Sequence, residues 1–72
     1  MRSAVAEVLS TARHDAGLSQ VALGKRAGVS GKFVGELERM EKSVSLDTLA
    51  RLARGLKTVT VGVLLLRIAN TT

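Results

Sequence analysis

Few side chains in this sequence have the chemistry that catalysis or metal binding needs. The 72 residues include one histidine, His14, and no cysteine, so the groups from which nucleophilic and zinc sites are built are nearly absent. Eleven lysines and arginines outnumber six acidic residues, which gives a formal net charge of +5. We therefore expect no catalytic residues, no metal site and no cofactor. The excess positive charge suits a phosphate-rich partner, although such charge also serves solubility.

Residues 17–40 contain the local signals of two short helices joined by a tight turn. Ser19 and Ser30 each precede a short apolar-periodic stretch, where a serine hydroxyl can accept a hydrogen bond from a free amide of the first turn. Gly28 lies between the stretches and can adopt the left-handed conformation that ends a helix, and Gly24 would allow close approach of the two helices. Five residues give the two helices their apolar faces: Leu23, Ala27, Val29, Val34 and Leu37. The pattern predicts a helix-turn-helix, which is typical of DNA-binding proteins.

Three more helices are predicted outside this motif. One is expected over residues 3–16 and ended by Gly17, and another begins at Ser45 after a charged loop over residues 40–44. The apolar residues of the second follow the helical period: Leu46, Leu49, Leu52, Ala53 and Leu56. Residues 58–66 are ambiguous, because their valines alternate as in a strand, but Thr60 can cap a helix there. We favour the helix, which gives an all-α domain of five helices.

The length fits one small domain over residues 1–72, whose stability as a monomer would be marginal and would benefit from dimerisation. Glu7 interrupts the apolar N-terminal segment and no cleavage signature follows, so we expect no signal peptide. The apolar stretch at residues 59–69 is far shorter than the roughly 20 residues that cross a bilayer. The lack of cysteine fits a reducing compartment. We therefore expect a soluble cytoplasmic protein, associated with the nucleoid.

Residues at fixed offsets along nearly the whole chain form one combined pattern. It consists of Arg13, Gly17-Leu18-Ser19-Gln20, Leu23, Gly28-Val29-Ser30, Val34, Leu37-Glu38-Arg39 and Ser45-Leu46-Asp47-Thr48-Leu49. With this pattern the sequence resembles the Cro and phage-repressor type (xenobiotic-response-element type) of helix-turn-helix transcriptional regulator. Within that family it is most similar to the short controller proteins of restriction-modification systems. The resemblance implies a five-helix, lambda-repressor-like DNA-binding domain that dimerises through its last helix.

The resemblance also implies which residues contact DNA, because the third helix of such domains enters the major groove. Gln20 is placed to meet a phosphate and to brace the recognition helix, or it is simply exposed. Lys32 can donate to guanine or contact only phosphate, and Glu36 can accept from a cytosine amine or repel other sequences. Arg39 and Lys42 flank the end of the helix, where they can hold phosphates or be ordinary surface charges.

Four further residues complete the expected DNA-binding set. Ser30 begins the recognition helix, and Phe33 either touches a thymine methyl or packs in the core, with a partly exposed position favoured. Gly31 and Gly35 depart from the usual pattern, because glycine inside a helix costs about 1 kcal/mol relative to alanine. Close approach of the helix to DNA would explain them, and specificity would then depend partly on DNA shape.

Arg13 and Glu38 correspond to an architectural ion pair between the first and third helices of the family. The regulator implied by the resemblance is a homodimer on a near-palindromic operator, with its recognition helices about 34 Å apart. Four apolar residues are expected at the dimer interface: Val61, Leu64, Leu65 and Ile68.

An antitoxin of a toxin-antitoxin operon is the alternative function, since it uses the same domain to bind operator DNA and a toxin. In some antitoxins an intermolecular strand follows the fourth helix, which would explain the alternation at residues 58–61. Residues 70–72 are too few to wrap a toxin, so a toxin would dock on the folded domain. RNA polymerase would be a further partner of a regulator.

Overall fold

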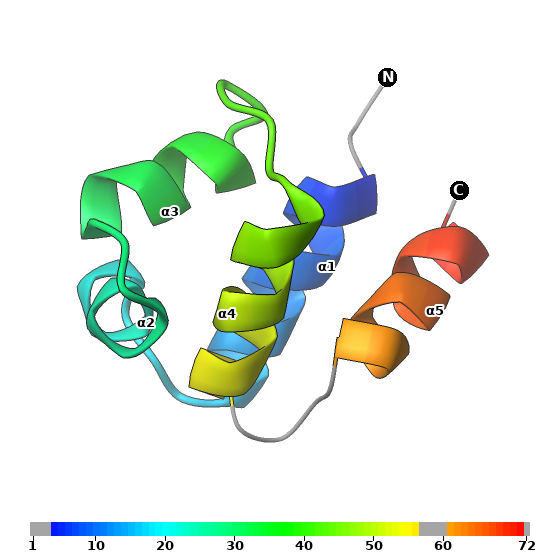
Figure 1. Cartoon of the computed structure of the whole chain (residues 1–72), viewed down its shortest axis with the longest axis horizontal. Helices are drawn as coiled ribbons and strands as arrows, with labels where there is room; N and C mark the ends of the chain where they lie inside the picture. Colours follow the sequence, from blue (N-terminus) through cyan, green and yellow to red (C-terminus); the bar gives the residue numbers. More distant parts are fainter. Residues whose placement is uncertain (1–3, 57–60, 72) are drawn as a thin grey trace.

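The chain forms five α-helices that pack around an apolar core (Figure 1). The computed structural model describes residues 4–56 and 61–71. In these residues the helices are α1 (Ala4–Asp15), α2 (Gln20–Ala27), α3 (Gly31–Glu38), α4 (Leu46–Leu56) and α5 (Val61–Thr71). The predicted all-α fold of five helices is confirmed, with helix bounds close to those expected from the sequence.

Serine hydroxyls cap three of the helices. Those of Ser19, Ser30 and Ser45 each accept a hydrogen bond from the backbone amide three residues later, at 3.0, 3.0 and 3.1 Å. Such a cap satisfies an amide that has no partner within the helix and contributes about 1 kcal/mol. The caps therefore fix where α2, α3 and α4 begin, as the sequence predicts.

The turn between α2 and α3 depends on two glycines. Gly28 ends α2 in the left-handed conformation, with φ 76° and ψ 29°. Gly24 is buried, and a Cβ built on it would lie only 2.6 Å from the carbonyl oxygen of Val29. Since that oxygen belongs to the backbone, only glycine at position 24 allows α2 to approach the turn so closely. The close approach expected at Gly24 is confirmed.

All five helices contribute side chains to the core. The largest fully buried side chains are those of Leu9, Leu23, Leu52, Leu56, Leu64 and Val34. In the helix-turn-helix the expected apolar faces are buried, and Val29 packs against them from the turn. In α4 the buried stripe begins one turn later than expected, at Leu49, because Leu46 at the first residue of the helix is 65% exposed.

The last helix, α5, packs against α1 and α4 (Figure 1). Residues 61–66 are helical, so the alternative of an intermolecular strand is wrong for them. The expected cap at Thr60 lies outside the described residues. Leu64 is fully buried, whereas Leu65 and Leu66 are 43% and 62% exposed. Neither α5 nor another helix in the described ranges has the length and hydrophobicity that a bilayer-spanning segment requires.

Candidate nucleic-acid interface

The outer side of α3 carries polar side chains, and its inner side is held in the core. Val34 and Leu37 are 2% and 3% exposed and pack against the other helices. Lys32 is exposed, and Glu36 is half-buried one helical turn later. Residues four apart lie on one face of a helix, so these two side chains form a polar strip along the outside of α3. A cation and a carboxylate at this spacing can donate to and accept from the edges of bases.

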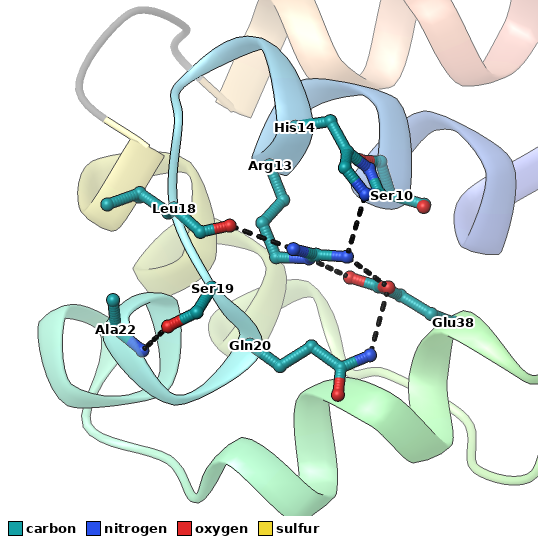
Figure 2. Close-up of polar contacts among 8 residues, drawn as sticks. All are labelled: Ser10, Arg13, His14, Leu18, Ser19, Gln20, Ala22 and Glu38. Carbon is teal, nitrogen blue, oxygen red and sulfur yellow. Dashed lines mark hydrogen bonds and ion pairs between the residues drawn. The ribbon is translucent and has the colours of Figure 1, made fainter.

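Three side chains connect α3 to α1 and α2 (Figure 2). Nε and Nη2 of Arg13 donate to Oε2 and Oε1 of Glu38 at 2.7 and 3.0 Å. Nη1 of Arg13 donates to the carbonyl oxygen of Leu18 at 2.8 Å. From the start of α2, Nε2 of Gln20 donates to Oε1 of Glu38 at 3.2 Å. The ion pair implied by the resemblance is therefore formed, and Gln20 braces α3 through the same carboxylate.

The charges of this network are held by their mutual hydrogen bonds. Burial by itself would raise the pKa of Glu38, but hydrogen bonds from Arg13 and then Gln20 outweigh it, so the pKa lies below its ordinary value of 4.5. The hydrogen bond to Glu38 likewise raises the pKa of Arg13 against the opposing effect of burial. Arg13 is only 8% exposed, and its guanidinium serves the connection between helices.

His14 extends the network at the end of α1. Its Nδ1 lies 2.7 Å from the carbonyl oxygen of Ser10, and its Nε2 lies 3.5 Å from Nη2 of Arg13 (Figure 2). A hydrogen on Nδ1 would donate to the carbonyl and leave Nε2 to accept from the guanidinium. The histidine thus lies beside the ion pair, on the exposed side of α1.

Gly31 and Gly35 face α2, which corrects the expectation that they allow approach to DNA. A Cβ on Gly31 would lie 2.8 Å from Cγ2 and 2.9 Å from Cα of Val21. A Cβ on Gly35 would lie 3.0 Å from Oε1 of Gln20 and 3.0 Å from Nη1 of Arg39. The two glycines let α3 pack closely onto the first turn of α2. Packing against α2 thus explains both glycines, so their presence does not require close approach to DNA.

Ser30 and Phe33 both take part in the structure of α3 itself. The hydroxyl of Ser30 caps the helix by accepting from the amide of Phe33 at 3.0 Å, although Ser30 is exposed. The ring of Phe33 is half-buried and packs against the core. Part of the Phe33 ring therefore packs in the core, and the exposed part is available for contact with a thymine methyl group.

Two basic residues flank the end of α3. Arg39 is exposed and its Nε donates to Oε2 of Glu41 at 3.1 Å. This hydrogen bond raises the pKa of Arg39 and offsets part of its charge, so a phosphate at Arg39 would compete with Glu41. Lys42 is exposed in the loop before α4.

The residues expected at a dimer interface do not share one environment. Leu64 lies in the protomer's own core, with 0% exposure, so it is not available to a second copy and its assignment to the interface is corrected. Ile68 is half-buried and packs against the same core. Leu65 is exposed, and the side chain of Val61 lies outside the described part of the structure. The large apolar side chains exposed on α5 are those of Val63, Leu65 and Leu66.

Sequence reasoning missed Val21 and the exposed residues beside Leu65. Val21 is 57% exposed at the second residue of α2, next to Gly31. A glycine at the first residue of α3 was the available signal, because it marks where another side chain approaches. On α5, Leu64 and Ile68 are four residues apart and share the face that packs on the core. The helical period therefore indicates that Leu66 lies on another face of the helix.

Comparisons with known proteins agree with this arrangement. The model of a family described as a helix-turn-helix domain matches residues 4–66. Two solved structures of the clp gene regulator ClgR from Corynebacterium glutamicum are similar, each with 30% sequence identity and a TM-score of 0.87. The alignments cover 96% and 97% of this chain and 72% and 90% of the ClgR chains. No curated protein matches.

Proposed function

Because the chain belongs to the helix-turn-helix domain family of DNA-binding transcriptional regulators, we propose that it acts as a homodimer on a near-palindromic operator. The observation that carries the proposal is the outer side of α3, where Lys32 and Glu36 share one strip while the opposite side is buried. In helix-turn-helix proteins the second helix of the motif lies in the major groove, with its first residues at the base edges. In this chain that helix is α3.

Lys32 and Glu36 are the side chains that distinguish bases. The ammonium group of Lys32 donates to O6 and N7 of guanine, and the carboxylate of Glu36 accepts from the amine of cytosine. Each well-placed contact of this kind contributes about 1–3 kcal/mol of discrimination against a wrong base. Glu36 also excludes sequences, because a carboxylate that finds no donor near the phosphates is repelled.

The DNA backbone is held on both sides of this strip. The first amides of α2, at Gln20 and Val21, begin a helix whose dipole favours a phosphate. The side chain of Gln20 is engaged with Glu38, so it supports α3 while the backbone meets the phosphate. Lys42 and Arg39 supply positive charge beyond the other end of α3. These contacts position the domain, and the strip on α3 supplies the specificity.

A second copy of the chain covers the exposed apolar side of α5. Val63, Leu65 and Leu66 are 40%, 43% and 62% exposed there, and adjacent exposed leucines on a small domain mark an interaction surface. A two-fold axis makes each copy bury the same surface of the other. It also places two recognition helices in successive major grooves, about 34 Å apart.

Among regulators of this fold, we place the chain with the short controller-protein and phage-repressor type. The intermolecular strand that follows the fourth helix in some antitoxins does not occur at residues 61–71 of this chain, which are helical. The similar solved structures belong to a regulator of clp genes, which supports a role in controlling particular genes. Isolation of the protein from its own operon with a bound toxin would instead support the antitoxin.

Selection of bound sequences from a random duplex pool, with sizing of the complexes, tests this proposal. At near-physiological salt we expect a two-fold symmetric site bound by two copies. Affinity should fall with salt by about 0.9 logarithmic units per tenfold increase for each phosphate neutralised. If the folded protein enriches no site, the proposal of sequence-specific binding is wrong, and one copy per enriched site would contradict the dimer.

A further inference from the structure

The first residue of α3 has no side chain, and a side chain of α2 covers it. Val21 approaches Gly31 so closely that a Cβ on the glycine would lie 2.8 Å from Cγ2 of the valine. The Cα of Val21 would lie 2.9 Å from the same position. The isopropyl group of Val21 therefore lies where a side chain at the start of α3 would otherwise project.

This valine is exposed although it is apolar. Val21 is 57% exposed, whereas Leu23 and Ala27 of the same helix are 0% and 4% exposed and form part of the core. The contact with Gly31 therefore leaves more than half of this branched apolar side chain exposed. Lys32 follows Gly31 in α3 and is also exposed, so Val21 lies at the same end of α3 as this lysine.

We propose that Val21 contacts the 5-methyl group of a thymine in each half-site of the operator. The inference rests on the proposed function, in which the first residues of α3 face base edges in the major groove. Thymine is the base that presents an apolar group in that groove. An isopropyl group offers no hydrogen bond, so it distinguishes thymine from the other bases by this methyl alone. A residue of α2 then supplies the specificity that Gly31 cannot.

The test uses the operator obtained by selection and replaces each thymidine, one at a time, by deoxyuridine. This change removes the 5-methyl group and leaves the base pairing intact. Binding is measured for the unchanged protein, for Val21→Ala and for a control, Leu46→Ala, which shortens an exposed apolar side chain at the first residue of α4. Val21→Thr, which keeps the shape and one methyl group, is the second variant at this site.

At one thymine of each half-site, deoxyuridine should weaken binding of the unchanged protein by about fourfold, the effect of one buried methyl group. The same replacement of thymidine should leave the affinity of Val21→Ala unchanged and should weaken binding of Val21→Thr by an intermediate factor. It should still weaken binding of the control Leu46→Ala by about fourfold. The inference is overturned if deoxyuridine lowers the affinity of the unchanged protein and of Val21→Ala equally at every thymine, or if it lowers the affinity at none. In either case, a selected two-fold symmetric site would leave the proposed function intact. Failure to select any site overturns both.

Discussion

The guanidinium of Arg13 in α1 and the carboxylate of Glu38 in α3 are joined by two hydrogen bonds, of 2.7 and 3.0 Å. Their side chains are 10% and 9% exposed. Gln20 of α2 donates to the same carboxylate, so one buried group holds three helices in register. The orientation of α3 in the domain therefore depends on this buried connection.

Glu38→Gln should lower the free energy of unfolding by about 3 kcal/mol, because it leaves the Arg13 guanidinium buried without a counter-charge. Denaturation by urea, followed by circular dichroism, measures the loss. Asp47→Asn is the matched control, since it breaks the exposed pair with Arg51 and should cost only about 0.5 kcal/mol. Equal losses in the two variants would show that the buried pair has no special structural role.

The same carboxylate should make stability depend on pH in the acid range. Since the pKa of Glu38 in the folded protein lies below its ordinary 4.5, the unfolded chain binds the proton more readily. The contribution is therefore fully present above pH 4.5 and is lost as pH falls through the folded pKa. Unfolding curves should show a constant advantage of the unchanged protein over Glu38→Gln above that pH and a shrinking one below it. An advantage that persists unchanged into strong acid would contradict this assignment.

Gly24→Ala should lower the free energy of unfolding by about 2 kcal/mol, in spite of the better helix propensity of alanine. The added Cβ would lie 2.6 Å from the oxygen of Val29 and 2.9 Å from the carbonyl carbon of Ser30, and neither backbone atom can turn aside. Gly62→Ala, at an exposed position of α5, should leave stability unchanged or raise it. Thermal melts of both variants measure these changes in stability. A Gly24→Ala protein as stable as the original would contradict the close approach of α2 to the backbone of Val29 and Ser30.

Leu65→Lys should convert the proposed dimer to a folded monomer, because it places a charge on the exposed side of α5 without disturbing the core. Leu64→Ala should act differently and lower the free energy of unfolding by about 3 kcal/mol, since it opens a cavity at a fully buried side chain. Sedimentation gives the oligomeric state, and circular dichroism gives the helix content. Persistence of a dimer in Leu65→Lys would exclude this side of α5 as the interface.

Lys32→Ala should weaken binding to the selected operator by about 30-fold, corresponding to about 2 kcal/mol, and relax the base preference at one position. Lys25→Ala removes the same charge from an exposed position at the last turn of α2, and it should leave the preference unchanged. Repeating the selection with both variants separates the effect of losing one positive charge from the effect of losing a contact with a base. A uniform loss on all sequences in Lys32→Ala would limit this lysine to a phosphate contact.

The features that the sequence predicted well depend on residues near one another in the chain. A serine cap involves an amide three residues later, and the turn at Gly28 depends on the left-handed conformation of a single residue. The pair between Arg13 and Glu38 joins distant residues, and it was anticipated only because the resemblance supplied it. Local chemistry thus predicts where helices begin and end, whereas family likeness predicts which of them are connected.

The features that the sequence did not predict depend on which element covers a given residue. Leu64 and Leu65 were both expected at the dimer interface, but the packing of α5 on α1 and α4 buries Leu64 and leaves Leu65 exposed. Gly31 and Gly35 were assigned to the DNA side of α3, and the approach of α2 uses them instead. Both differences follow from the placement of a neighbouring helix, which a periodic pattern within one segment does not encode.

The polar strip and the exposed apolar side of α5 lie on two different helices, α3 and α5, which have the neighbour α1 in common. α3 packs on α2 and α1, whereas α5 packs on α1 and α4 (Figure 1). In the proposed dimer, a substitution on the exposed side of α5 would change the angle between two copies and leave the polar strip of each copy intact. Operator spacing and half-site sequence can then diverge independently during evolution, so a duplicated gene could acquire a new spacing before it acquires a new sequence preference.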